Sequence, residues 1–255
     1  PKPPFIEHAA LFTFDEVSTT EVLQELVRTQ VLDGADCMSL SLVKMLLGVS
    51  PPVHAMEGEP DYGTLLSFSG STRIETQEKL KTLRRIVESS EHRLSRPLLI
   101  DWDAITALMG DQAASWVDFP SDAFKILTEY DGLTWVGTYI HPRNWGAALA
   151  GGRRIVEKHG FELMAFLKPM NGMHYGEFKF IIRFPKDETT VERVRLCNEE
   201  LLDHALDQNA IPYKTPVWAA KKLIARADPE FVNLVKRIRE MLDPNGIMNP
   251  GRWGI

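Results

Sequence analysis

The sequence predicts an α+β fold, an antiparallel sheet flanked by helices, on the basis of three observations. Strand-like runs alternate with amphipathic, helix-like segments along the chain. The same order recurs in both halves, which indicates two split β-α-β modules of the ferredoxin-like kind packed into one sheet. A last amphipathic helix is followed by a turn-rich segment, which predicts a C-terminal helical tail outside the two modules.

The first half contains a β-rich run at 5–14, followed by a helix whose start is indicated by the capping-box pattern Ser18-Thr-Thr-Glu21. This helix is expected to continue to about Gln30. The apolar segment 38–47 has a length that fits either a strand or a short helix. The other elements expected here are a Pro- and Gly-rich loop at 50–63, a strand at 64–69 and a long charged helix from Ser71 to about Glu91.

The second half repeats this order. Its predicted elements are a strand at 133–140, a helix at 144–159 that Gly160 ends, strands at 161–167 and 174–184, and a helix at 189–207. Between the halves, residues 95–130 show little periodicity, so we expect partly irregular structure there.

Composition narrows the function classes. The chain has 255 residues, 44% of them hydrophobic, and a net charge of −6 without a basic stripe, which argues against a nucleic-acid partner. No apolar run approaches the ~20 residues that span a bilayer, and the first residues lack a secretory-signal profile. We therefore expect no membrane association and a cytoplasmic location, with the periplasm as an alternative. Neither the scattered histidines nor Cys37 and Cys197 have metal-ligand spacing, so no metal site is predicted.

The tail carries the most specific pattern in the chain. Apolar residues recur at the helical spacing of a buried stripe, at positions 231, 234, 235, 238, 241 and 242. Asp243-Pro244 ends this helix, and Asn245-Gly246 and Asn249-Pro250-Gly251 supply two turns. The order of helix, Asp-Pro-Asn-Gly-Ile and Pro-Gly-Arg resembles the C-terminus of flavoprotein oxidases and dehydrogenases of the vanillyl-alcohol oxidase and p-cresol methylhydroxylase type.

The resemblance implies that residues 1–210 form a cap, or substrate, domain and that residues 211–255 complete an FAD-binding domain supplied mainly by other residues. In agreement, the sequence has no Gly-rich phosphate loop, and Gly151-Gly152 lies inside a helical pattern without a preceding strand. We interpret the chain as the C-terminal half of such an enzyme, a separate subunit or a fragment that is inactive alone. Its expected partners are an FAD-binding domain or subunit and, as is common in the family, a second copy in a homodimer. The cofactor-binding residues implied by the resemblance are Asn249, Pro250, Gly251 and Arg252.

Tyr213 and Lys214 are the first candidate catalytic residues. A phenol beside a cation can jointly hold an anionic oxygen, the phenol by O–H donation and the cation by charge. The resembled family has a Tyr-Arg-Thr triplet at this place that binds the substrate phenolate, which implies the same role here, with lysine in place of arginine. Lysine offers a point charge where arginine offers a planar fork. A structural tyrosine beside a solvated lysine is the alternative interpretation.

The strand at 174–184 supplies further candidates. The resemblance implies that it lines the cavity above the flavin ring, with His174 as a candidate for proton transfer and Tyr175 and Glu177 as substrate contacts. A hydrogen-bonded structural histidine is the alternative for His174.

Trp135 is a candidate substrate contact on the strand at 133–140, with simple strand packing as the alternative. No histidine stands at the place where some family members link the flavin covalently, so we expect dissociable FAD. A link through His141, Tyr139 or Tyr175 stays open.

These observations predict part of an FAD-dependent oxidoreductase that oxidises a small aromatic substrate, a 4-alkylphenol or an aryl alcohol, by hydride transfer to flavin. Two alternatives remain. One is part of a flavin-dependent 2-hydroxy-acid oxidoreductase, which the lysine favours slightly. The other is a non-catalytic ligand-binding or interaction domain that has lost its flavin module.

Overall fold

The computed structural model describes residues 5–46, 57–89, 96–117, 132–170 and 174–251 of the chain. Within these residues the strands form one eight-stranded sheet in the order β4-β1-β3-β2-β6-β7-β5-β8, and every neighbouring pair is antiparallel. The strands are β1 (Phe5–Thr13), β2 (Gly34–Ser39), β3 (Tyr62–Gly70), β4 (Leu98–Asp101), β5 (Gly132–Ile140), β6 (Met164–Met170), β7 (Tyr175–Phe184) and β8 (Ile211–Pro212).

The helices within the described residues are α1 (Glu16–Arg28), α2 (Leu40–Leu46), α3 (Arg73–Ser89), α4 (Trp102–Met109), α5 (Gln112–Val117), α7 (Trp145–Lys158), α8 (Glu188–Asp207), α9 (Val217–Arg226) and α10 (Pro229–Leu242). A short 3₁₀ turn, η2 (Pro142–Asn144), precedes α7. No helix in this part of the chain combines the length and the apolar character needed to cross a membrane.

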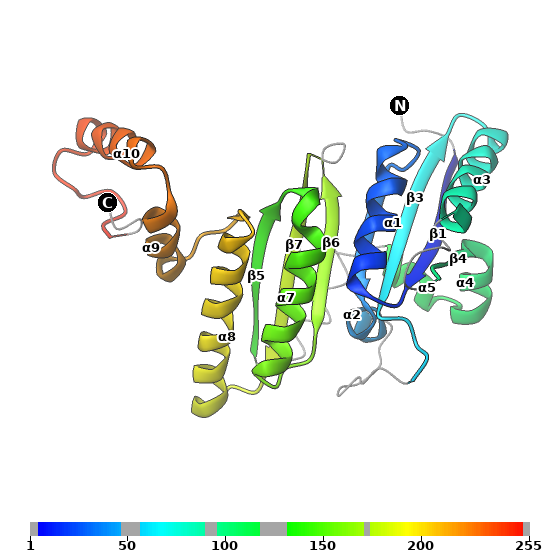
Figure 1. The fold of residues 1–255 in the computed structure, drawn as a ribbon, viewed down its shortest axis with the longest axis horizontal. Coiled ribbons are helices and arrows are strands. Elements are labelled where there is room, and N and C mark those ends of the chain that lie inside the picture. The colour runs from blue at the N-terminus through cyan, green and yellow to red at the C-terminus, as the bar shows by residue number, and fades with distance from the viewer. Residues whose placement is uncertain (1–4, 47–56, 90–95, 118–131, 171–173, 252–255) are drawn as a thin grey trace.

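The sheet consists of two modules with the same strand order. The first runs β4-β1-β3-β2 and carries α1 and α3, and the second, counted from its outer edge, runs β8-β5-β7-β6 and carries α7 and α8. Each is a split β-α-β unit of the ferredoxin-like kind. The predicted α+β fold of two such modules in one antiparallel sheet is therefore confirmed (Figure 1).

The two modules meet edge to edge, at β2 and β6. Cys37 lies opposite Leu167 and Met38 opposite Phe166. The Ser39 hydroxyl donates to the Leu163 carbonyl (3.1 Å) and accepts from the Ala165 amide (3.0 Å). This side-chain bridge extends a short ladder, because it satisfies backbone groups that the two strands leave unpaired.

A polar cluster joins the modules on the helical side. Arg153 of α7 forms ion pairs with Glu16 of α1 and with Asp61 (3.0 Å), and the Tyr62 hydroxyl donates to Glu16 (2.8 Å). Burial raises the pKa of Tyr62 well above its ordinary value, so the phenol stays protonated and donates. The cluster therefore links α1, β3 and α7 across the module boundary.

Helices cover the two sheet faces unequally. One face packs beneath α1, α3, α7 and α8 along both modules and holds the larger apolar core (Figure 1). On the opposite face, α2, α4 and α5 cover the first module, where Trp116 and Met38 are fully buried. The outward side chains of β5 and most of those of β7 on this second face are half-buried or exposed. We call this surface of the second module the open face.

Several element boundaries differ from the sequence-based expectations. Helix α1 begins after Asp15, whose carboxylate accepts from the Ser18 amide (2.7 Å), so the expected start at Ser18 is wrong by one turn. An aspartate is an equally good cap and precedes the serine. The open choice for 38–47 is resolved as the end of a strand followed by the short helix α2.

Within the range 95–130, where partly irregular structure was expected, residues 98–117 contain β4, α4 and α5. Residues 118–131 lie outside the described part. These elements have 4, 8 and 6 residues, too short for a clear periodic signal.

The apolar stripe of α10 is not buried within this chain. Its large side chains are exposed, among them Phe231 (57%), Leu234 (53%) and Met241 (73%). Figure 1 shows α10 away from the sheet, beyond α9. The described residues of this chain therefore do not cover the stripe, and its burial against a module formed by other residues stays a prediction. Helical spacing shows that a stripe is apolar, but it does not show what covers it.

Gly151 and Gly152 lie within α7, as their helical pattern predicted, and face the core. A Cβ on Gly152 would overlap the ring of Phe180, and one on Gly151 would overlap His204. We expect Gly152→Ala to lower the free energy of unfolding by about 1–3 kcal/mol, because the ring must move within a packed core. Urea denaturation measures this, with Gly34→Ala as the control, since a Cβ on Gly34 meets nothing within 4 Å. Equal stability of the two variants would contradict the close packing of Phe180 against Gly152.

Candidate functional site on the open face

The open face gathers the candidate catalytic and substrate-binding residues other than His174. Side chains alternate across a strand, so Trp135, Gly137 and Tyr139 share one face of β5, and Tyr175, Glu177 and Lys179 share the same face of β7. The register places Tyr139 opposite Glu177 and Gly137 opposite Lys179. Tyr213 and Lys214 follow β8, which pairs with β5 at the edge of the sheet.

Tyr213 lies at the centre of this group. Its phenol oxygen accepts a hydrogen bond from the Trp135 indole N–H (3.0 Å), and its ring lies 5.5 Å from that of Tyr139. The Tyr139 ring in turn packs edge-on to Tyr175 at 5.0 Å. Residues distant in sequence therefore form one aromatic surface on the open face.

Gly137 makes room for the Tyr213 ring. A Cβ at this position would overlap Cε1, Cζ and Oη of that ring. The backbone amide of Tyr213 also points at the Gly137 carbonyl, at 3.4 Å. The ring therefore occupies the space that a side chain at position 137 would fill, so only glycine fits there without a shift of the ring.

The surroundings keep Tyr213 protonated. Burial raises the pKa of the phenol to about 12, with a further upward contribution from the negative charge of Glu177 and a downward one from the Trp135 hydrogen bond. At neutral pH the hydroxyl is thus a neutral donor, the form that stabilises an anionic oxygen.

Two lysines contribute positive charge, in different ways. Lys179 forms an ion pair with Glu177 (3.0 Å), and its ammonium lies 4.8 Å from the centre of the Phe166 ring and 6.0 Å from that of Tyr213. Lys214 has no carboxylate partner among the described residues, and its ammonium lies 5.8 Å from the centre of the Trp135 ring. Lys214 is therefore the cation available for a ligand. Lys179 was not predicted, although its spacing of two from Glu177 signals the same face.

A groove of about 800 Å³ runs along this edge of the second module. Its lining includes Trp135, Gly137, Tyr213, Lys214 and Trp218. This volume lies within the range of small-molecule sites, and the lining combines apolar surface with a few polar groups.

The other candidates lie apart from this group. His174 is exposed in the turn before β7, with no hydrogen bond or ion pair to its side chain among the described residues. Asn249, Pro250 and Gly251 form an exposed turn beyond α10. Arg252 lies outside the described residues. Asp243 anchors the start of this tail by accepting from the amides of Ile247 (2.9 Å) and Met248 (2.8 Å).

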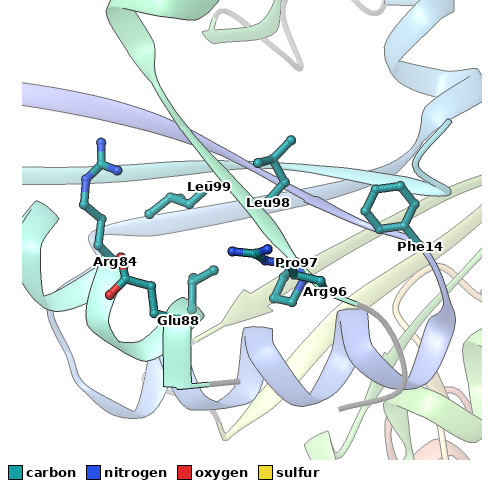
Figure 2. A pocket seen from close by; sticks show the side chains of 8 residues that line it. Phe14, Arg84, Glu88, Arg96, Pro97, Leu98 and Leu99 are labelled. Atoms are coloured by element: carbon teal, nitrogen blue, oxygen red, sulfur yellow. The ribbon is translucent and has the colours of Figure 1, made fainter. Parts of the chain in front are cut away.

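A second cavity of about 690 Å³ lies at the far module, between α3 and β4 (Figure 2). Arg84 and Arg96 contribute guanidinium groups to its lining beside Leu98 and Leu99. Arg84 is already paired with Asp101. The open face is therefore the better candidate site, because it offers a cation without such a partner.

The described residues fit one part of an FAD molecule. The open face presents aromatic rings and ammonium groups, which suit the face of a flavin ring. The diphosphate has no equivalent cradle there, because Gly151 and Gly152 pack in the core and Gly137 accommodates Tyr213. The chemistry of this face therefore suits a flavin ring, whereas the FAD diphosphate would need donors from other residues.

The fold and the open face define an α+β domain of two split β-α-β modules with one polar and aromatic sheet face. Residues 218–253 match the family model described as FAD linked oxidases, C-terminal domain. The match covers α10, most of α9 and the segment that follows α10.

Solved structures with the same fold include p-cresol methylhydroxylase with substrate bound (TM-score 0.77, 16% identity) and 4-ethylphenol oxidase from Gulosibacter chungangensis in an isoeugenol complex (0.76, 14%). Each match covers 100% of this chain but only 54% and 55%, respectively, of the matched proteins, so the chain spans about half of their length. Alkyldihydroxyacetonephosphate synthase matches more distantly (TM-score 0.57, 10% identity, 97% of this chain and 44% of that one). None of the curated proteins matches the sequence.

The resemblance predicted from the tail is therefore confirmed. The chain resembles the C-terminal part of FAD-linked oxidases of the vanillyl-alcohol oxidase and p-cresol methylhydroxylase type, in its fold and in its last helices.

Proposed function

We propose that this chain is the substrate-binding part of an FAD-dependent oxidoreductase that acts on a small aromatic substrate, a 4-alkylphenol or an aryl alcohol. The observation that supports this most directly is that a protonated phenol, Tyr213, and a lysine, Lys214, line the same groove. Such a pair holds a phenolate oxygen by donation and by charge. Phenol-oxidising enzymes among the structural matches agree with this choice of substrate.

The residues of this chain orient the substrate and stabilise its charge. Tyr139 and Tyr175 offer ring edges and faces against which an aromatic substrate packs. Tyr213 and Lys214 hold the oxygen that gains negative charge when the substrate loses a proton. Oxidation of the substrate C–H bond by hydride transfer is the chemistry that the flavin supplies when bound.

We further propose that residues 211–255 complete an FAD-binding module formed mainly by other residues, with residues 1–210 as the cap over it. The exposed stripe of α10 supports this, because an apolar stripe of several large side chains is costly to leave in water. It lies within the segment that matches the C-terminal domain of FAD linked oxidases. The flavin is proposed to be dissociable, and the complete assembly to be a homodimer.

The test is purification of the tagged chain from its own host, followed by spectroscopy. We expect it to copurify with flavin bound to a module that holds the FAD diphosphate, giving the visible flavin absorption. Anaerobic addition of 4-ethylphenol should then bleach that absorption, whereas 2-hydroxy acids should not. Bleaching by a 2-hydroxy acid alone would favour the hydroxy-acid alternative. Colourless protein that takes up no added FAD would favour a non-catalytic domain.

A further inference from the structure

We propose that Trp135 and Gly137 are positioning residues that hold the phenol of Tyr213 against β5, so that its hydroxyl proton points into the groove as a donor to an anionic substrate oxygen. This inference rests on the proposed function for the identity of the acceptor. The arrangement of these three residues rests on the structure of this chain alone.

The hydrogen bond decides the direction of the proton. The Trp135 indole can only donate, so in the 3.0 Å contact the Tyr213 oxygen is the acceptor. The hydroxyl proton must then point elsewhere. The described residues offer it no acceptor, while the groove that Tyr213 lines lies open beside it. The Tyr213 hydroxyl is therefore available to donate a hydrogen bond to a ligand in the groove.

The absent side chain at Gly137 fixes the position of the ring. Any Cβ there would overlap the phenol at Cε1, Cζ and Oη, the atoms nearest the functional group. Because Trp135 and Gly137 are two residues apart, they present their contacts on the same face of the strand. Gly137 lets the Tyr213 ring come close to the sheet, and Trp135 donates the hydrogen bond to the Tyr213 oxygen.

The chain itself, without flavin, permits the first test. In ¹H–¹⁵N spectra, the Trp135 indole signal is identified by its loss in Trp135→Phe. We expect that signal to shift in Tyr213→Phe, which removes the acceptor, and in Gly137→Ala, which displaces it. In Gly34→Ala it should stay in place, since a Cβ there meets nothing within 4 Å. An indole signal whose chemical shift is the same in Tyr213→Phe as in the unmodified chain would overturn the proposal.

A second measurement reports on the phenol. With 3-fluorotyrosine incorporated, ¹⁹F spectra resolve the tyrosines, and Tyr213→Phe identifies the signal of Tyr213. We expect Gly137→Ala to lower the pKa of that phenol toward its ordinary value, because burial is the main cause of its elevation. Gly34→Ala should leave it unchanged. An unchanged pKa in Gly137→Ala would show that the ring does not depend on this glycine.

Turnover of 4-ethylphenol by the flavin-loaded assembly separates a positioning role from a structural one. Gly137→Ala should lower kcat/KM at least tenfold in the presence of Tyr213 and should have little further effect once Tyr213 is phenylalanine. Equal losses in both backgrounds would overturn the positioning role. If no phenol is turned over at all, the proposed function fails, while the two spectroscopic results still decide how Tyr213 is held.

Discussion

Replacing Lys214 with methionine in the flavin-loaded assembly is expected to lower kcat for a 4-alkylphenol by about 10²–10³, the usual loss when one group that stabilises a developing anion is removed. Methionine keeps an apolar stem of similar length and removes only the charge. Lys214 has no carboxylate partner among the described residues, so the substitution strands no buried anion there. The decrease in kcat should therefore reflect the loss of the interaction between the Lys214 ammonium and the substrate.

Stopped-flow reduction of the flavin measures this effect directly. Tyr213→Phe should lower the rate of flavin reduction by a similar factor. The double variant should lower it by less than the product of the two single-variant factors, because both groups act on one oxygen. Lys81→Met on α3 is the matched control, since Lys81 is exposed on the other module and its ion pair within the described residues is with exposed Glu78. Reduction as fast in Lys214→Met as in the control would remove Lys214 from the site.

The modules were predictable from sequence because their signals are local. Strand β7 alternates Glu177 and Lys179 with buried Phe178 and Phe180, and β5 is rich in β-branched and aromatic residues. Helix α8 follows Asp187, which accepts from the Thr190 amide (2.9 Å) as a helix cap. The repeated order of strands and helices was sufficient to predict two split β-α-β units. It did not show that the units join at β2 and β6, because edge pairing depends on contacts between the halves.

The site was predictable as residue types but not as an arrangement. Trp135 and Tyr213 are 78 positions apart, and their contact follows from the pairing of β5 with β8. Strand β8 has only two residues, too few to leave a periodic pattern. Gly137 carried no sequence signal at all, since the reason for a glycine there is the ring that lies against it.

The apolar face of α10 carries the second large prediction. Single substitutions Phe231→Asp and Ile238→Asp should abolish association with the FAD-binding module while leaving the folding of this chain unaffected. Both side chains are exposed here, at 57% and 43%, so the free energy of unfolding should stay within about 0.5 kcal/mol. In the complex each would place a carboxylate within an apolar interface, and we expect affinity to fall more than about 100-fold.

Two measurements on the same variants separate these effects. Urea denaturation of the isolated chain reports stability, and copurified flavin reports association. Asn233→Asp adds the same charge on the opposite side of the helix, where Asn233 is exposed, and should preserve both. If Asn233→Asp weakened association as much as Ile238→Asp, charge alone would explain the loss. If Ile238→Asp kept its flavin, the stripe would not be the docking surface, and the cap would have to be held by the open face alone.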